Sequence, residues 1–398
     1  MKLARALFFL FLVIFPFGQL AKLLNIFGLS FNLCFIDLLA FLVFLIWLLE
    51  KTLKKQISKT SFFKFKPTIL FLLVASVSLF LNSGRFEVGE LMISSLYLLR
   101  FAIYFGFFLA LIDLAKSSEK FLNYLLAIGT GFAMFGVLQL GLWPNLKALE
   151  TIGWDPHFYR LTSTFLDPNF AGLILVFTFL ISLVSFLKKR KWKFFFLTIF
   201  LFICVFLTQS RSSLLALFFG ISIFCFFKLN LKAILLAVIV LAVGASLVPK
   251  PAGEGGKFLR TYSINARMVG YSNAIEVIKD NLLFGVGFNT YRYIQRDYGF
   301  LDKTSWKENN AGAGIDSSLL LVLATTGIIG LIAFLWQGVF FIKLAWKRKT
   351  SDEGIIFLSS AGALLIHSLF VNSMFYPWIM GWMAVLLAGT AQIKESKR

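Results

Sequence analysis

Long apolar runs separated by short polar segments occupy most of the chain. We distinguish about twelve runs, and most of them approach the ~20 residues with which an α-helix crosses a bilayer. The pattern predicts an all-α polytopic membrane protein with about 12 transmembrane helices, organised as a single integral membrane domain over residues 1–398. The runs lie approximately at residues 6–20, 31–49, 67–81, 91–114, 121–143, 170–187, 194–207, 214–227, 233–248, 317–342, 355–371 and 374–391.

The longest polar segment, residues 249–316, separates the ninth run from the tenth. Between Arg267 and Asp280, apolar residues alternate with charged ones in the manner of an interfacial helix. We therefore expect a large extracytoplasmic loop between helices 9 and 10 that carries short amphipathic helices. The seventh and eighth runs are short and flank Arg211, so they are expected either to be tilted or to form a broken pair around it.

The composition excludes a soluble domain, because a chain that is 59% hydrophobic with a mean hydropathy of +0.84 cannot cover its surface with polar groups. The net charge of +20 does not indicate nucleic-acid binding, since the basic residues cluster in short loops at alternate ends of the runs. That distribution follows the positive-inside rule and suits anionic membrane lipids. It predicts a multi-pass protein of the inner (cytoplasmic) membrane with cytoplasmic N- and C-termini, and it places residues 144–169, residues 249–316 and Arg211 outside.

Metal or disulfide chemistry is not indicated. The three cysteines all lie within apolar runs without paired spacing, and the two histidines, His157 and His367, are far apart in the sequence. These cysteines resemble small core residues, and no Cys/His cluster suggests zinc or iron. We expect no cofactor.

Two arginines in polar segments are candidates for anion binding. Arg211 has only small polar neighbours, and an arginine near membrane depth usually lines a cavity or binds an anion. Its planar guanidinium group suits a phosphate. The alternative is a side chain that extends to the membrane interface. Arg160, which leads into the sixth run, is the second candidate.

Two aspartates precede predicted helices. Asp167 stands before Pro168-Asn169, which is a favourable helix start, so helix capping is its preferred role. Asp316 precedes Ser317-Ser318 at the start of the tenth run. It is expected either to cap that helix or to act as a general base, since burial would raise the pKa of its carboxyl group.

Arg100 lies in the middle of the fourth run, where a charge needs a partner. Asp37, in the second run, lies at a similar predicted depth. We therefore predict that Arg100 and Asp37 form an ion pair.

Several short motifs occur in a characteristic order over residues 160–330. Together they resemble the O-antigen ligase and O-antigen polymerase (Wzy-type) superfamily, as does the layout of about twelve helices with one large outer loop. The motifs are Arg160 with Pro168-Asn169, Ser210-Arg211-Ser212, Arg267 with Tyr271 four residues later, Gly285-Val286-Gly287-Phe288, and Thr326-Gly327-Ile328-Ile329-Gly330.

The resemblance implies a metal-independent glycosyltransferase of cell-surface polysaccharide synthesis. Its substrates would be an undecaprenyl-diphosphate-linked oligosaccharide and an acceptor glycan or glycolipid such as lipopolysaccharide, and it would either transfer or polymerise the glycan. Arg211 and Arg267 match arginines thought to hold the diphosphate, and Arg160 matches a third basic position. Asp316 stands where ligases have a catalytic histidine, and Ser317 stands where they often have asparagine.

These considerations give a candidate site. Lipid diphosphate is a good leaving group whose developing charge arginines can neutralise, and a carboxylate can take the proton of an acceptor hydroxyl. The assigned catalytic residues are Asp316, Arg211 and Arg267, and the assigned substrate-binding residues are Arg160, Asn169, Ser210 and Tyr271.

Two alternatives remain open at this point. Aromatic residues in the outer loops would either stack on sugar rings or anchor the protein at the interface; they include Trp154, Tyr271, Tyr291 and Trp306. A transporter or flippase for lipid-linked glycans would also suit about twelve helices. The concentration of charge in one asymmetric outer loop favours an enzyme.

Overall fold

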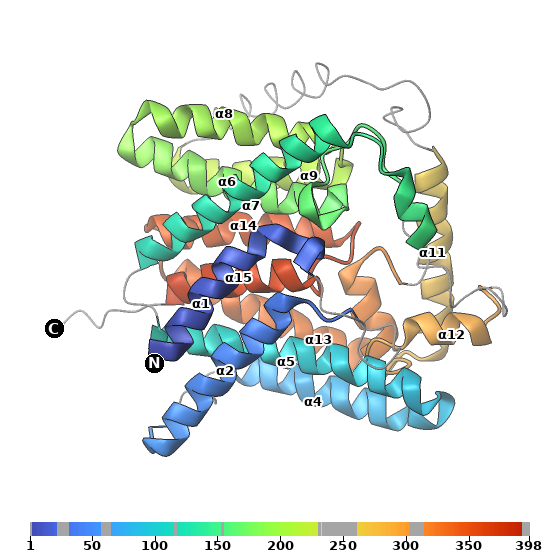
Figure 1. The fold of residues 1–398 in the computed structure, drawn as a ribbon. Helices are drawn as coiled ribbons and strands as arrows, with labels where there is room; N and C mark the ends of the chain where they lie inside the picture. Colours follow the sequence, from blue (N-terminus) through green and yellow to red (C-terminus); the bar gives the residue numbers. More distant parts are fainter. Residues whose placement is uncertain are drawn as a thin grey trace.

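The structure is a bundle of helices that run roughly side by side, with one helix, Thr261–Asp280, set across one end (Figure 1). It is a computed structural model that describes residues 2–21, 32–56, 65–114, 118–152, 155–229, 232, 261–301 and 314–391. Within these ranges the chain forms α-helices, short 3-10 turns and one isolated bridge between Asn145 and Phe158. The all-α prediction is confirmed for the described residues.

The α-helices are α1 (Lys2–Ile14), α2 (Phe35–Leu53), α4 (Lys66–Leu81), α5 (Val88–Leu114), α6 (Ser118–Leu142), α7 (Pro168–Lys189), α8 (Trp192–Leu207), α9 (Arg211–Lys228), α11 (Thr261–Asp280), α12 (Tyr291–Asp297), α13 (Ser318–Trp346), α14 (Asp352–Ser368) and α15 (Pro377–Ala391). The 3-10 turns are η1 (Phe15–Ala21), η3 (Ser83–Arg85), η4 (Lys147–Ile152) and η5 (Ser163–Phe165).

Each predicted apolar run except the ninth, residues 233–248, contains one of these helices; the ninth lies outside the described residues. By length and composition, six helical segments of the described chain are able to cross a membrane, and three shorter helices are also apolar. The protein is therefore an integral membrane protein, and the count of twelve spans stays a prediction. The segment around Arg211 is broken as expected, because α8 ends at Leu207 and α9 begins at Arg211.

Helix α7 forms the centre of one half of the bundle and packs against α6, α8, α9 and α14. Small residues permit this close approach, which drives helix association in lipid. A Cβ atom on Gly172 would overlap the side chain of Ser213 in α9, and one on Gly129 would overlap Thr178. Gly172 thus lets the start of α9 lie tightly against α7, and Gly129 does the same for α6.

The predicted partner of Arg100 is confirmed. Its Nη2 atom lies 2.8 Å from Asp37 Oδ2, and the Tyr104 hydroxyl donates to Asp37 Oδ1 at 3.1 Å. Arg100 and Asp37 are both almost fully buried. The pair thus connects α2 to α5 inside the bundle.

Helix α13 is interrupted at Gly327, whose φ of +66° lies in the left-handed region that glycine favours. The break exposes backbone groups of α13 to the segment after α11. The Val286 N–H donates to the Ala324 carbonyl at 3.0 Å, and the Ile328 N–H donates to the Leu282 carbonyl at 2.9 Å. The Gly-x-Gly motif at 285–287 therefore packs a loop against a broken helix.

The two ends of the bundle differ in charge. Lys188 and Lys228 both pair with Asp352, at 3.2 and 3.1 Å, and Lys51 pairs with Asp113 at 2.9 Å. The first two contacts join the ends of α7 and α9 to the start of α14, and the third joins the ends of α2 and α5. Helices α11 and α12 lie at the opposite end, on the right in Figure 1, whereas α1 begins on the left.

Candidate functional site

Three helices begin at the same end of the bundle, and each is capped by a side chain. Asp167 accepts hydrogen bonds from the Asn169 and Phe170 N–H groups at 2.7 and 3.2 Å, which confirms its predicted capping role for α7. Ser210 caps α9 and Ser317 caps α13. The alternative of Asp316 as a helix cap is therefore wrong, because the adjacent serine occupies that position.

Arg211, the first residue of α9, is half-buried at this end. Arg267, from α11, lies within electrostatic range of it, so the two positive charges repel one another. Helix starts carry partial positive charge, which adds to that of the arginines. The arrangement favours an anion between the start of α9 and α11.

Arg267 also contacts the carboxylate of Asp316, with 3.3 Å between Nε and Oδ2. Most of the Asp316 side chain (58%) is exposed, yet desolvation by the surrounding protein raises the pKa of its carboxyl group. The charge of Arg267 opposes that rise, and the nearby carboxylates of Asp167 and Asp155 add to it. The structure thus brings together the three residues predicted to be catalytic.

Tyr271 lies one helical turn after Arg267. Its hydroxyl is 2.8 Å from the Leu369 carbonyl oxygen and 3.1 Å from that of Asp316. The side chain connects α11 to the end of α14 and to the segment before α13. Tyr271 therefore fixes the position of α11, which carries Arg267, relative to Asp316.

Arg160 lies directly behind the Arg211 segment and is 9% exposed. Its Nε atom donates to the Thr208 carbonyl at 2.9 Å, and Nη2 donates to the Gln209 carbonyl at 3.4 Å. These contacts orient the turn that precedes Arg211. The structure therefore gives Arg160 a supporting position.

Ser210 and Asn169 join the starts of α9 and α7. The Ser210 hydroxyl donates to Asn169 Oδ1 at 2.8 Å, and the Ser213 hydroxyl lies 2.9 Å from Ser210 Oγ. Both Ser210 and Ser213 are buried. The two predicted substrate-binding residues thus contact each other in the layer beneath Arg211.

His367, for which the sequence predicts no role, also lies in the layer beneath Arg211. It is fully buried near the end of α14, with Nε2 3.2 Å from Ser212 Oγ and Nδ1 2.6 Å from Ser373 Oγ. The feature of the sequence that could have identified this residue is a histidine in an otherwise apolar run. Its serine partner in α9 lies 155 residues away in the sequence, so the contact itself was not visible there.

The predicted aromatic residues have different positions. Tyr291 is 2% exposed and packs in a small core with Val277 and Ile294, so the idea that it stacks on a sugar is wrong. Trp154 and Trp306 lie outside the described residues.

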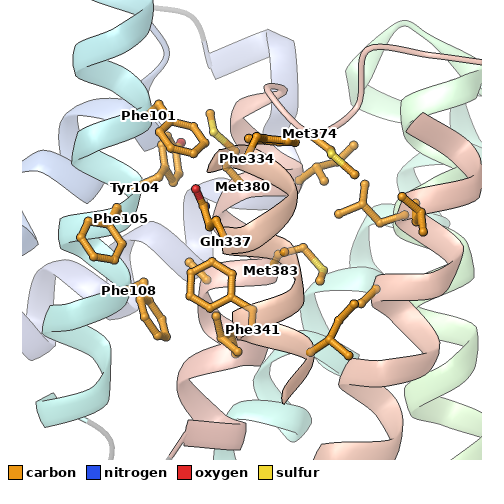
Figure 2. A pocket seen from close by; sticks show the side chains of 18 of the residues that line it. Phe101, Tyr104, Phe105, Phe108, Phe334, Gln337, Phe341, Met374, Met380 and Met383 are labelled. Atoms are coloured by element: carbon orange, nitrogen blue, oxygen red, sulfur yellow. The ribbon is translucent and has the colours of Figure 1, made fainter. Parts of the chain in front are cut away.

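An apolar cavity of about 320 Å³ lies between α5, α13, α14 and α15. Figure 2 shows Phe101, Phe105 and Phe108 of α5 along one side of it. Its lining includes Leu319, three residues after Asp316, and Met374, next to Ser373. The cavity lining therefore includes residues that are close in the sequence to Asp316 and to Ser373.

Residues 196–335 match the family model described as O-Antigen ligase. The match supports membership of the O-antigen ligase and polymerase superfamily. It includes Arg211, Arg267 and Asp316, whereas Arg160 and Asn169 precede it. No curated protein matches the chain. The O-antigen ligase-like region thus contains all the residues predicted to be catalytic, and it supports a membrane protein that processes glycans.

Proposed function

We propose that the protein transfers or polymerises glycan from an undecaprenyl-diphosphate carrier at the outer face of the cytoplasmic membrane. The observation that carries the proposal is the meeting of Arg211, Arg267 and Asp316 at one end of the bundle, within the region that matches the family. The family match gives no support to the alternative of a transporter or flippase.

In the proposed reaction, the acceptor hydroxyl attacks the anomeric carbon of the donor sugar. The bond between that carbon and the diphosphate oxygen breaks, and the diphosphate keeps the electron pair. Arg211 and Arg267 neutralise its charge, which removes the need for a metal ion. Asp316 takes the proton of the acceptor hydroxyl as general base.

The apolar cavity supports a lipid-linked donor. Leu335, Val339 and Leu365 line it and are themselves between 41% and 46% exposed, so the cavity opens on the side of the bundle. An isoprenoid chain is flexible and apolar, and it suits a cavity lined by phenylalanine and methionine. A lipid with its tail in the cavity would extend its head toward Asp316.

The proposal predicts that Arg211→Ala and Arg267→Ala abolish transfer, because each removes one charge that stabilises the departing diphosphate. The measurement uses proteoliposomes with lipid-linked repeat units on the site face and resolves the products by size. A ladder of products would indicate a polymerase, and a single added unit would indicate a ligase.

The matched control is Lys279→Ala, which removes an exposed positive charge from the same helix as Arg267. We expect it to retain wild-type activity. Full activity in both arginine variants, with normal insertion into the membrane, would refute the assigned site.

A further inference from the structure

We propose that His367 is a positioning residue that sets the spacing between the Arg211 half and the Asp316 half of the site. The inference rests on the proposed function and adds to it a residue that lies outside the matched region. His367 is fully buried, so it does not contact a substrate in the site. His367 must therefore influence the site through the residues that it contacts.

On one side, His367 contacts the first turn of α9. Its Nε2 atom lies 3.2 Å from Ser212 Oγ and 3.4 Å from Ser213 Oγ. Ser212 Oγ also lies 3.1 Å from Ser210 Oγ, the cap of the helix. Since Arg211 stands between these serines in the sequence, the histidine constrains the turn that carries its guanidinium group.

On the other side, His367 contacts the segment between α14 and α15. Its Nδ1 atom lies 2.6 Å from Ser373 Oγ. The adjacent residues reach the start of α13, because Ser318 Oγ lies 3.2 Å from Asn372 Oδ1 and accepts from the Met374 N–H at 3.1 Å. Ser318 is two residues from Asp316. Hydrogen bonds and short stretches of backbone therefore connect His367 to both halves of the site.

An imidazole ring is suited to bridge Ser212 and Ser373. The neutral ring has one donor and one acceptor nitrogen, and serine hydroxyls can both donate and accept. A single side chain can therefore hold hydroxyl groups on two different helix ends at a set separation. An apolar replacement would remove both contacts, and the serine hydroxyls would keep only their local partners, such as Ser210 Oγ for Ser212 and the Val371 carbonyl for Ser373. The link between the two helix ends would then be lost.

The test compares His367→Ala, His367→Gln and His367→Asn in the transfer assay. The glutamine amide can approach the place of Nε2 and contact Ser212, whereas the asparagine amide can approach the place of Nδ1 and contact Ser373. We expect His367→Ala to lower kcat by up to about 10²-fold with a smaller change in donor KM, since misplaced catalytic groups cost rate. Glutamine should restore more of kcat than asparagine, because it keeps the contact to the Arg211 turn.

Two further measurements separate positioning from other roles. Ser212→Ala should also lower kcat, and the double variant should be no worse than His367→Ala, because His367→Ala already removes the contact to Ser212. The pH profile of His367→Gln should match that of the wild type, since the proposed role involves no proton transfer. Ser360→Ala is the control: Ser360 is buried in the same helix, and its hydroxyl lacks a hydrogen-bond partner among the described residues.

Wild-type kcat in a folded Ser212→Ala or His367→Ala variant would refute the inference. Equal and complete inactivity of the folded alanine, glutamine and asparagine variants would also refute it, because that pattern indicates a proton-carrying histidine. In both cases an active wild type leaves the proposed function standing. Absence of transfer activity in the wild-type protein would instead refute the proposed function and, with it, this inference.

Discussion

At the residue scale, Arg267 has two potential partners, the Asp316 carboxylate and the donor diphosphate. Its Nε atom lies 3.3 Å from Asp316 Oδ2, and this positive charge opposes the rise in the pKa of the carboxyl group. If the diphosphate draws Arg267 away, Asp316 loses that stabilisation and becomes a stronger base. Donor binding would thus activate the general base when a leaving group is present.

Asp316 variants test this coupling. We expect Asp316→Asn to lower kcat by about 10²–10⁴-fold, the usual contribution of a general base, while donor KM stays unchanged or falls because Arg267 loses its competing partner. Since the base must be deprotonated, wild-type activity should fall as the pH drops through the raised pKa of Asp316.

Asp316→His should retain activity and change the pH at which it falls. The ordinary pKa of histidine, about 6.5, is higher than that of aspartate, about 3.9, whereas desolvation at this site raises the pKa of a carboxyl group and lowers that of an imidazole. The measurement is kcat as a function of pH for the three proteins. Identical profiles for the wild type and Asp316→His would show that residue 316 is not the base.

Single residues were predictable from the sequence where their physics is local or where they carry charge. Asp167 precedes a helix start, and Arg100 and Asp37 stand in apolar runs where each charge needs a partner. The network around His367 was not predictable, because its serines come from α9 and from the segment after α14. Only the packing of α9 against α14 brings them together.

At the element scale, the helices followed from the apolar runs, but the break in α13 did not. The sequence showed Gly285-Val286-Gly287 and Thr326-Gly327 as separate motifs. In the structure they form one contact, in which backbone lies against backbone, and a Cβ atom on Gly327 would overlap the Leu283 carbonyl. Such pairing between distant backbone segments leaves no periodic pattern in the side chains.

Gly327→Ala tests that contact. Gly327 has a φ of 66° and a ψ of −171°, a conformation essentially confined to glycine that costs another residue about 1–3 kcal/mol, and the overlap with Leu283 adds to this. We therefore expect a lower free energy of unfolding in detergent and reduced transfer, because the loop that follows α11 would shift.

Gly131→Ala, in the interior of helix α6 and outside the cavity lining, is the matched control. A Cβ atom there meets no heavy atom within 4 Å among the described residues, and alanine favours a helix over glycine by about 0.5–1 kcal/mol. Equal stabilities of the two variants would mean that the break at Gly327 does not hold the loop.

At the scale of the whole molecule, charge separates the two ends of the bundle. The lysines that pair with Asp352 and Asp113 lie at one end, and Arg211, Arg267 and Asp316 lie at the other. Under the positive-inside rule, the lysine-rich end faces the cytoplasm and the proposed site faces outward. This orientation is a prediction from charge.

Single cysteine substitutions test the orientation. Ser272→Cys on α11 should react with a membrane-impermeant maleimide in intact cells, and Thr350→Cys, between α13 and α14, should react only after the membrane is opened. Both positions are exposed, and neither substitution changes the charge that sets topology. The native cysteines Cys34, Cys204 and Cys225 are buried and should give little background in the wild-type control. Labelling of Thr350→Cys but not of Ser272→Cys in intact cells would place the site in the cytoplasm, where a donor on the outer face could not reach it.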